Sequence, residues 1–409
     1  MLLQLHGWID ELNEVHLDHL GRAWLHWRAA LRSPELSLRQ LRRMESRIDA
    51  HADALLLGAE SARATLEAAL VGDEDDLARA AADVLLLGAL GDGCKLLRDA
   101  LAAAPTPARA DLLLDAIWLR PSPALVDSLE AQDLERAPAR LQIAQRLALA
   151  AVRRSGPPSP PLSALLSGDD VRVRRWAWLL LALDANEPFD RALWERQLSD
   201  ATPQLREVLF AAAAQRRQEW LVNAVRERAE HDLVAARWLA VLGGPADFER
   251  LLAVARRAAF GPERFLVLAS SGDARALPFL VESCALPLPA DASAAAWAFR
   301  LLTGHDVHSL ERVASVPPGS ALPDAFDALF LDEVFLPDLA RARAWVEQHG
   351  AELAPGRRWR RGLDLDALQG PATDALDPLS LVERAWRARA APGADAWSMP
   401  GELYPLPLR

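Results

Sequence analysis

The chain has 409 residues, of which 51% are hydrophobic, and a formal net charge of −11 at pH 7. Residues that favour β-strands are scarce, with four Ile, five Thr and a single Tyr, whereas the helix-favouring Ala, Leu and Arg dominate. This composition excludes a strand-rich fold and predicts an all-α protein. The acidic balance argues against a protein that wraps nucleic acid, because such proteins usually present a basic stripe.

The cysteines and the apolar segments bear on the compartment. Cys94 and Cys284 are too far apart in sequence to indicate a disulfide framework or a metal knuckle, so a reducing compartment fits. Residues 1–12 lack the basic start of a signal peptide and contain two acidic residues. The longest apolar run, 176–183, is far shorter than the ~20 residues that span a bilayer. We therefore expect a soluble cytoplasmic protein with no membrane span.

Residues 1–71 are expected to form a helical cap at the N-terminus, without a clear repeat. Apolar spacing predicts helices over 16–31 and 36–57, and Ser37 is placed to cap the second of them. A third helix is expected to follow and to end near Gly72.

Turn-like breaks recur through the middle of the chain, at intervals of about 31 residues. They lie near Gly72, Thr106, Arg136, Gly168, Asp200, His231, Gly261 and Asp291. Each interval is long enough for two short helices and two turns. One helix pair cannot bury its own apolar face, whereas stacked pairs can. The period therefore predicts a superhelical stack of helix pairs, an α-solenoid, over residues 72–305.

Apolar stripes at helical spacing support each unit of this array. The first runs through Leu77, Ala81 and Val84, and the later ones lie within 173–181, 205–212, 234–239, 265–269 and 294–301. The proline-rich segment 155–161 cannot be helical and is expected to be an exposed loop within the array.

The C-terminal region, 306–409, is predicted to be irregular, since Pro317, Pro318 and Gly319 interrupt it early. Helices are expected over 339–349 and 379–390, with a basic turn between them. The proline-containing tail 392–409 is expected to be extended.

Parts of the array carry a turn Asp, then Val or Leu followed by Arg, then small residues at helical spacing. This pattern includes Asp170 with Val173, Arg174 and Ala177, and Asp200 with Leu205, Arg206 and residues 211–214. The pattern resembles HEAT-like repeats. The resemblance covers the array, and it implies a HEAT-like α-solenoid with no particular activity.

A second resemblance extends over nearly the whole chain. It rests on three groups of residues: His16, Trp24, Ser37, Leu38, Leu41, Glu45, Arg47, Ile48, Ala50, His51, Asp53 and Leu55; Trp297, Ala298, Phe299, Thr303 and Gly304; and Leu336, Pro337, Asp338, Trp345 and 356–362. Together they resemble an uncharacterised family of proteobacterial proteins of about this length, some of them linked to type VI secretion gene clusters. The resemblance implies a bacterial cytoplasmic protein. It implies no activity for this chain, because the family has none assigned.

A basic turn in the C-terminal region is the candidate partner-binding site. Its residues are Arg357, Arg358, Trp359, Arg360 and Arg361. Such a turn could hold a phosphate, a nucleic-acid backbone or an acidic protein surface, with the tryptophan stacking or anchoring. The alternative is a solvated turn that neutralises the nearby Asp364 and Asp366 while Trp359 packs into the C-terminal core.

Three histidines share one side of the first predicted helix. His16, His19 and His26 fall within an arc of about 80°, and His51 could reach them from the next helix. Two imidazoles at this spacing can share a metal ion. The alternative is a partly exposed helix face with His51 hydrogen-bonding inside the helix pair. Because no cysteine or carboxylate spacing supports a metal site, we expect no metal and no cofactor.

The tryptophans of the helical patterns are expected to pack in the core and between repeats. Trp176 and Trp178 lie about 200° apart on an ideal helix, so one of the two is expected to be exposed.

The function expected from these patterns is a non-catalytic scaffold or adaptor that binds a protein or peptide partner on the solenoid surface. The family resemblance implies a partner in a secretion or effector system. No nucleophile elbow, P-loop, dinucleotide fingerprint or Cys–His pair occurs. One alternative is an enzyme on a HEAT-like scaffold, either a lyase or a DNA-glycosylase-like protein. The other is a nucleic-acid binder, should the arginine clusters at 152–154, 172–175 and 357–361 share one face.

Overall fold

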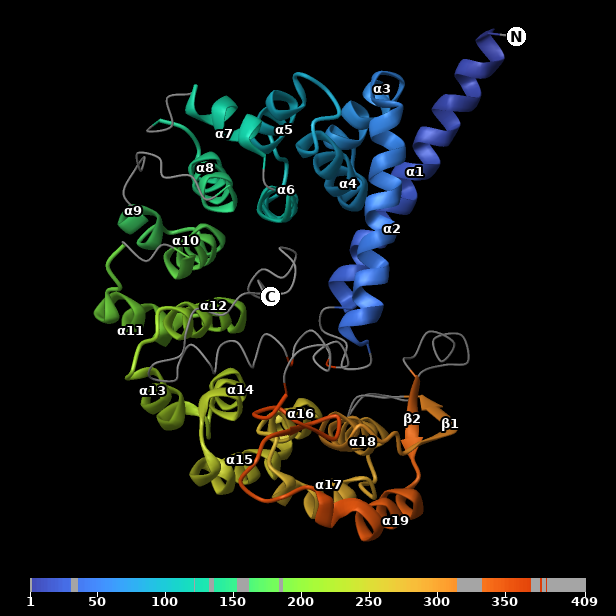
Figure 1. Ribbon diagram of the computed structural model, residues 1–409. Coiled ribbons are helices and arrows are strands. Elements are labelled where there is room, and N and C mark those ends of the chain that lie inside the picture. The colour runs from blue at the N-terminus through green and yellow to red at the C-terminus, as the bar shows by residue number, and fades with distance from the viewer. Residues whose placement is uncertain are drawn as a thin grey trace. The chain divides into compact units, whose positions relative to one another are not determined.

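The structure is a computed structural model, and the residues it describes are 2–30, 36–120, 122–131, 136–152, 162–183, 187–314, 333–368, 376 and 380. These residues fall into two compact units that divide after Arg216. Helices make up most of both units, and the strands are few and short (Figure 1). The all-α class predicted from composition is confirmed. The expected boundaries at 71/72 and 305/306 remain predictions.

The first unit is built from helices alone in the part that the structure describes. They are α1 (Leu2–Ala30), α2 (Leu38–Leu57), α3 (Ala59–Val71), α4 (Asp75–Leu86), α5 (Gly93–Ala102), α6 (Pro107–Leu119), α7 (Pro123–Glu130), α8 (Ala139–Ala151), α9 (Leu162–Leu166), α10 (Val171–Leu183), α11 (Arg191–Asp200) and α12 (Pro203–Gln215). Helix α1 packs against α2, α3 and α4. From α4 onward, α4, α6, α8, α10 and α12 form one row in which each helix contacts the next.

Local sequence explains where several of these helices begin. The side chain of Ser37 accepts a hydrogen bond from the backbone of Gln40, whose own side chain accepts one from the backbone of Ser37. This reciprocal pair satisfies two backbone donors that α2 could not satisfy internally. The side chains of Thr106 and Thr202 cap α6 and α12 by each accepting one hydrogen bond from a backbone N–H three residues later, and each threonine is followed by a proline whose fixed φ suits a first helical turn.

In its described part, the second unit combines seven α-helices with two small antiparallel sheets. Its elements are α13 (Leu221–Arg228), α14 (Leu233–Leu242), α15 (Phe248–Ala255), α16 (Glu263–Ser270), α17 (Leu277–Ser283), α18 (Pro289–Thr303), β1 (His308–Ala314), β2 (Glu333–Pro337), α19 (Leu339–His349), β3 (Trp359–Arg360) and β4 (Leu363–Asp364). Helices α14, α16 and α18 form a row, and α13, α15 and α17 each pack against the next helix of that row. Strand β1 pairs with β2, with Val313 opposite Val334, and β3 pairs with β4.

Helix pairs therefore stack in chain order inside each unit, which buries one face of each pair against its neighbour. Seven of the eight predicted breaks fall at helix ends or between helices. The eighth, Asp291, lies in the first turn of α18, because Pro289 starts that helix two residues earlier. A continuous HEAT-like solenoid over the whole array stays a prediction.

Other expectations had mixed outcomes. The helix over 339–349 coincides with α19, and the helix over 36–57 corresponds to α2. The prediction that the first helix begins at residue 16 was wrong, since α1 begins at Leu2. The strands β1 and β2 were not predicted. The expected loop 155–161, the helix 379–390 and the tail 392–409 lie outside the described residues, apart from Ser380.

The expectation that Trp176 or Trp178 would be exposed was wrong, since both are buried. Helix α10 is covered on two sides. The Trp176 indole donates to Asp111 of α6 (2.7 Å), and the Trp178 indole donates to Gln197 of α11 (2.8 Å). The two indoles lie on opposite sides of α10, and each is buried against a different neighbouring helix.

Candidate functional site

The predicted basic turn lies beside the C-terminal ends of three helices in the second unit. We call residues 358–362 the crossing segment. Arg358 donates hydrogen bonds to the carbonyl oxygens of Ala240 (3.0 Å), Val241 (2.8 Å) and Gly243, at the end of α14. A cation at this position satisfies carbonyls that have no partner within the helix and complements the negative end of the helix dipole.

The rest of the crossing segment makes equivalent contacts with the ends of α16 and α18. Arg360 is 2% exposed and donates to the carbonyl oxygens of Ala269 and Ser270, at the end of α16. At the end of α18, the backbone N–H of Arg361 donates to Leu301 (2.7 Å), and the next N–H donates to Leu302 (3.0 Å). Residues 358–362 thus bind the ends of α14, α16 and α18, the three helices of one row.

Glycines permit this close approach. Gly304, which ends α18, has a φ of +77°, and a Cβ placed there would lie 2.6 Å from the carbonyl oxygen of Arg361. Gly272 has a φ of +71°, and its Cβ would lie 2.9 Å from the backbone nitrogen of Trp359, which donates to the Gly272 carbonyl. Only glycine, which has no Cβ, adopts a positive φ and allows the backbone of another segment to come this close at low cost.

The turn therefore divides into structural and surface residues. The guanidinium groups of Arg358 and Arg360 are directed to carbonyls of the fold itself. Arg357 is exposed and forms an ion pair with Asp364, as the alternative reading of the turn expected. Trp359 is half-buried and its indole donates to the carbonyl of Ala354 (3.0 Å). Partner binding at this turn stays a prediction, and the guanidinium groups of Arg357, Arg358 and Arg360 already have partners within the fold.

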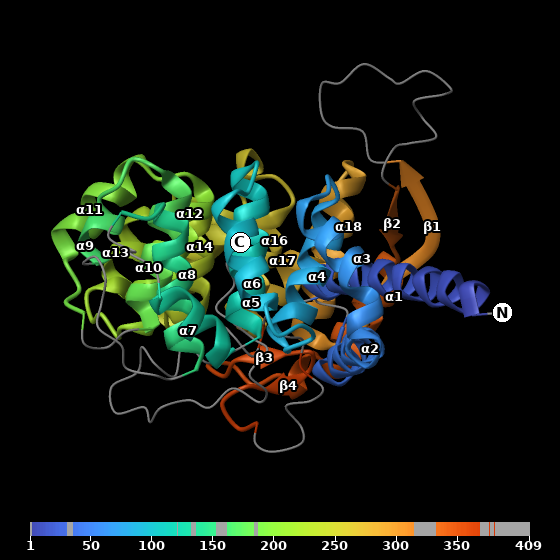
Figure 2. The same ribbon diagram turned by 90° about the horizontal axis from the view of Figure 1, so that it is seen from above.

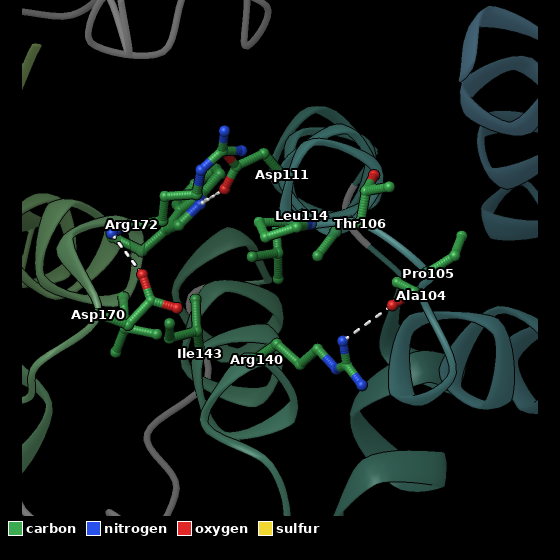
Figure 3. A pocket seen from close by; sticks show the side chains of 13 residues that line it. Ala104, Pro105, Thr106, Asp111, Leu114, Arg140, Ile143, Asp170 and Arg172 are labelled. Atoms are coloured by element: carbon green, nitrogen blue, oxygen red, sulfur yellow. Dashed lines mark hydrogen bonds and ion pairs between the residues drawn. The ribbon is translucent and has the colours of Figure 1, made fainter.

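A groove of about 180 Å³ lies in the first unit, at the N-terminal ends of α6, α8 and α10 (Figure 3). Its lining combines apolar and polar side chains: Ala104, Pro105, Thr106, Pro107, Ala110, Asp111, Leu114, Arg140, Ile143, Asp170, Arg172, Val173 and Trp176. The charges are largely compensated. Asp111 accepts from Arg172 (2.9 Å) and from the Trp176 indole, and Arg175 lies 3.2 Å away. The groove thus combines apolar side chains such as Leu114 and Ile143 with charged side chains that already have partners.

Arg140, on the rim of this groove, belongs to a repeated structural contact. It donates to the carbonyls of Ala102 and Ala104, in the turn of the preceding helix pair. Arg109 stands 31 residues earlier and donates to the carbonyls of Leu70 (3.2 Å) and Gly72 (2.9 Å) in the same way. Each of these arginines joins its helix to the end of a preceding one. Sequence reasoning missed this role, although the 31-residue spacing of the two arginines was visible.

The histidine cluster lies where α1 packs against α2. The Nδ1 atoms of His16 and His51 are 3.1 Å apart, and the ring of His19 lies 5.2 Å from that of His51, centre to centre. Burial, together with the charges of His16, His19 and Arg47, lowers the pKa of His51. His26 is exposed. Among the described residues, no three His, Cys, Asp or Glu side chains are arranged to hold a metal ion.

The two cysteines are shielded thiols. Burial raises the pKa of Cys284 to about 11, and burial also raises the pKa of Cys94, despite a contact of 3.7 Å between its sulfur and the Ser122 hydroxyl. A thiol with a raised pKa is a poor nucleophile because little thiolate is present at neutral pH.

The arginine clusters considered for nucleic-acid binding serve the fold where they are described. Arg172 and Arg175 pair with Asp111, and Arg174 donates to the carbonyl of Gly168 (2.7 Å). Arg153 and Arg154 lie outside the described residues.

An exposed apolar stripe on α1 is the feature that sequence reasoning missed most clearly. Trp8 is 66% exposed, Leu12 44% and Val15 50%. They recur at i, i+4 and i+7, so they follow one side of the helix. The first half of α1 extends beyond α2 and α3 (Figures 1 and 2). The spacing of the three residues could have revealed the stripe, had the predicted helix begun before residue 16.

The opposite side of α1 explains why this stripe stays uncovered. Leu17, Leu20 and Trp24 are buried against the following helices, and Asn13 on the same side is buried and donates to Ser61 of α3 (3.2 Å). Helix α1 therefore uses one side for the core of the first unit. On the other side of the helix, Trp8, Leu12 and Val15 face solvent.

Helices of the described chain are all too short or too polar to cross a lipid bilayer. Comparisons with models of protein families, with curated proteins and with solved structures found no match for this chain.

Proposed function

We propose that this protein is a non-catalytic adaptor that binds another protein along the exposed side of α1. The observation that carries the proposal is the stripe of Trp8, Leu12 and Val15. Contiguous exposed apolar side chains on a soluble protein mark interaction surfaces, and tryptophan is enriched among the residues that dominate binding energy.

The stripe is large enough to matter energetically. Burying a large apolar side chain is worth about 2 kcal/mol, so three of them favour association before the costs of ordering are subtracted. Rigid presentation lowers those costs. The second half of α1 is fixed by Leu20, Trp24 and Trp27, all buried, so the helix is in place before a partner arrives.

Two further observations support an adaptor over an enzyme. The cysteine thiols have raised pKa values, and the acids and arginines of the groove are engaged with one another or with backbone groups. The resemblance to the type VI-linked family adds a proposed setting, in which the partner belongs to a secretion or effector system.

Site-specific crosslinking tests the proposal. A photo-crosslinking amino acid replaces Val15 in the full chain, expressed in cells of the native source. A matched protein carries the same group at Leu57, a residue of α2 that is 92% exposed and is not part of the stripe. We expect one abundant crosslinked protein from position 15 and none from position 57.

A second protein separates binding from folding. Trp8→Asp combined with Leu12→Asp should abolish the crosslink from position 15 while leaving the helical circular dichroism unchanged. Failure to obtain any specific crosslink from position 15, or an identical product from position 57, would contradict the proposal.

A further inference from the structure

We infer that the partner segment seated on α1 is a basic amphipathic helix. This inference rests on the proposed function and specifies the chemistry of the partner. It draws on the charges beside the apolar stripe, which the proposal above did not use.

An acidic row runs along one edge of the stripe. Glu11, Glu14 and Asp18 recur at i, i+3 and i+7. On an ideal helix these three acids lie roughly 60–120° around the helix axis from Trp8, all in the same direction. Glu11 and Glu14 are exposed and make no ion pair within the described part of the chain. The next charge along this side is Arg22, which pairs with Asp18 at 3.1 Å.

Helices that pair with each other commonly combine a row of apolar residues with charged residues beside it. Apolar residues interdigitate along the seam, while the flanking positions form salt bridges that choose the partner and its orientation. The stripe from Trp8 to Val15 covers two turns, so a partner helix needs apolar residues at matching spacing and Lys or Arg beside them.

The same charges disfavour two other occupants. A second copy of this chain would bring its own acidic row against Glu11 and Glu14, and like charges at an interface are repulsive. Surface helices that insert into anionic membranes carry Lys and Arg on their polar side, whereas the N-terminal half of α1 carries acids there.

Two synthetic peptides serve as probes. Both form amphipathic helices with the same leucine stripe, and they differ in the flanking row, which is lysine in one and glutamate in the other. Each is labelled with a fluorophore and titrated with the full-length protein at low salt, with anisotropy as the readout. We expect the lysine peptide to bind at least roughly tenfold more tightly than the glutamate peptide.

Three double variants then separate the contributions. Glu11→Lys with Glu14→Lys should weaken the lysine peptide about tenfold and strengthen the glutamate peptide. Trp8→Asp with Leu12→Asp should abolish binding of both. Glu219→Lys with Glu227→Lys changes the net charge equally at exposed positions of the second unit and should leave both affinities unchanged.

The outcomes distinguish this inference from the proposed function. Equal binding of the two peptides, or no effect of Glu11→Lys with Glu14→Lys, would overturn the basic partner while a crosslink at position 15 still upheld the adaptor. Self-association that Trp8→Asp abolishes, measured by sedimentation, would make a second copy the occupant. Binding to vesicles of phosphatidylcholine and phosphatidylglycerol through the stripe would assign a membrane surface and likewise overturn the inference.

Discussion

The guanidinium carbon of Arg79 on α4 lies 4.2 Å from the centre of the Trp24 ring on α1, and both side chains are buried. Arg79 is 3.6 Å from Asp83, and no acceptor lies within hydrogen-bond distance of its three nitrogens among the described residues. Burial lowers the pKa of Arg79 to about 10. Asp83 in turn receives a hydrogen bond from Arg120 at 2.9 Å, so the carboxylate has a second cationic partner.

Replacing this arginine should not harm the first unit. Because Arg79 is a buried cation with unsatisfied donors, Arg79→Met should leave the free energy of unfolding unchanged or raise it by about 1–2 kcal/mol. Urea denaturation followed by circular dichroism measures this. Asp83→Asn provides the contrast, because it leaves Arg79 and Arg120 facing each other, and it should cost about 3 kcal/mol. If both variants are equally destabilised, the contact between Arg79 and Trp24 stabilises the fold more than we expect.

The crossing segment should stabilise the second unit through Arg360. Arg360→Met removes the donors that reach the end of α16 and leaves buried carbonyls unpaired, so it should cost about 2–3 kcal/mol. Arg357→Met is the matched control, because the side chain is exposed and should matter little. Hydrogen exchange of α16 reads out the local effect, with faster exchange expected only in the first variant. Equal exchange in both would mean that Arg360 does not hold the helix end.

Gly304 provides a backbone test of the same contact. Gly304→Ala places a methyl group 2.6 Å from the carbonyl oxygen of Arg361 at a φ of +77°, so it combines steric conflict with left-handed strain. Gly261→Ala has a similar φ of +65° and open space around the new methyl group, and it should cost only the strain of about 1–2 kcal/mol. Thermal unfolding should show the larger loss for Gly304→Ala. Equal losses would indicate that the crossing segment can move aside.

Features determined by short-range sequence were the ones that could be predicted. Ser37 was expected to cap the second helix and does cap α2, and the helix expected over 339–349 coincides with α19, which Asp338 caps. The contact between Arg358 and Val241 joins residues 117 positions apart, and no local pattern encodes it. The basic turn was therefore predicted as a binding site and not as a structural contact, because arginines that cap helices and arginines that bind partners look alike in sequence.

The chain topology beyond the helices was equally hidden. Strands β1 and β2 pair across a long intervening segment, without the short turn signal that identifies a hairpin. The exposed stripe on α1 is a different case. Trp8, Leu12 and Val15 show helical spacing, but sequence cannot tell a stripe that faces solvent from one that faces the core.

The contact between His16 and His51 should make the first unit less stable in mild acid. The pKa of His51 is lowered from 6.5 by burial and by the charges of His16, His19 and Arg47. Below pH 6.5 the unfolded chain therefore takes up a proton at this residue that the folded chain resists. Stability falls as the pH drops through 6.5, until the pH passes the lowered folded value. His51→Gln removes this proton uptake, so its urea midpoint should change less between pH 7 and pH 5 than that of the unaltered protein. His231→Gln, at an exposed position of the second unit, serves as the control and should retain the full pH dependence. An unchanged slope in His51→Gln would show that the histidine cluster does not cause the acid sensitivity.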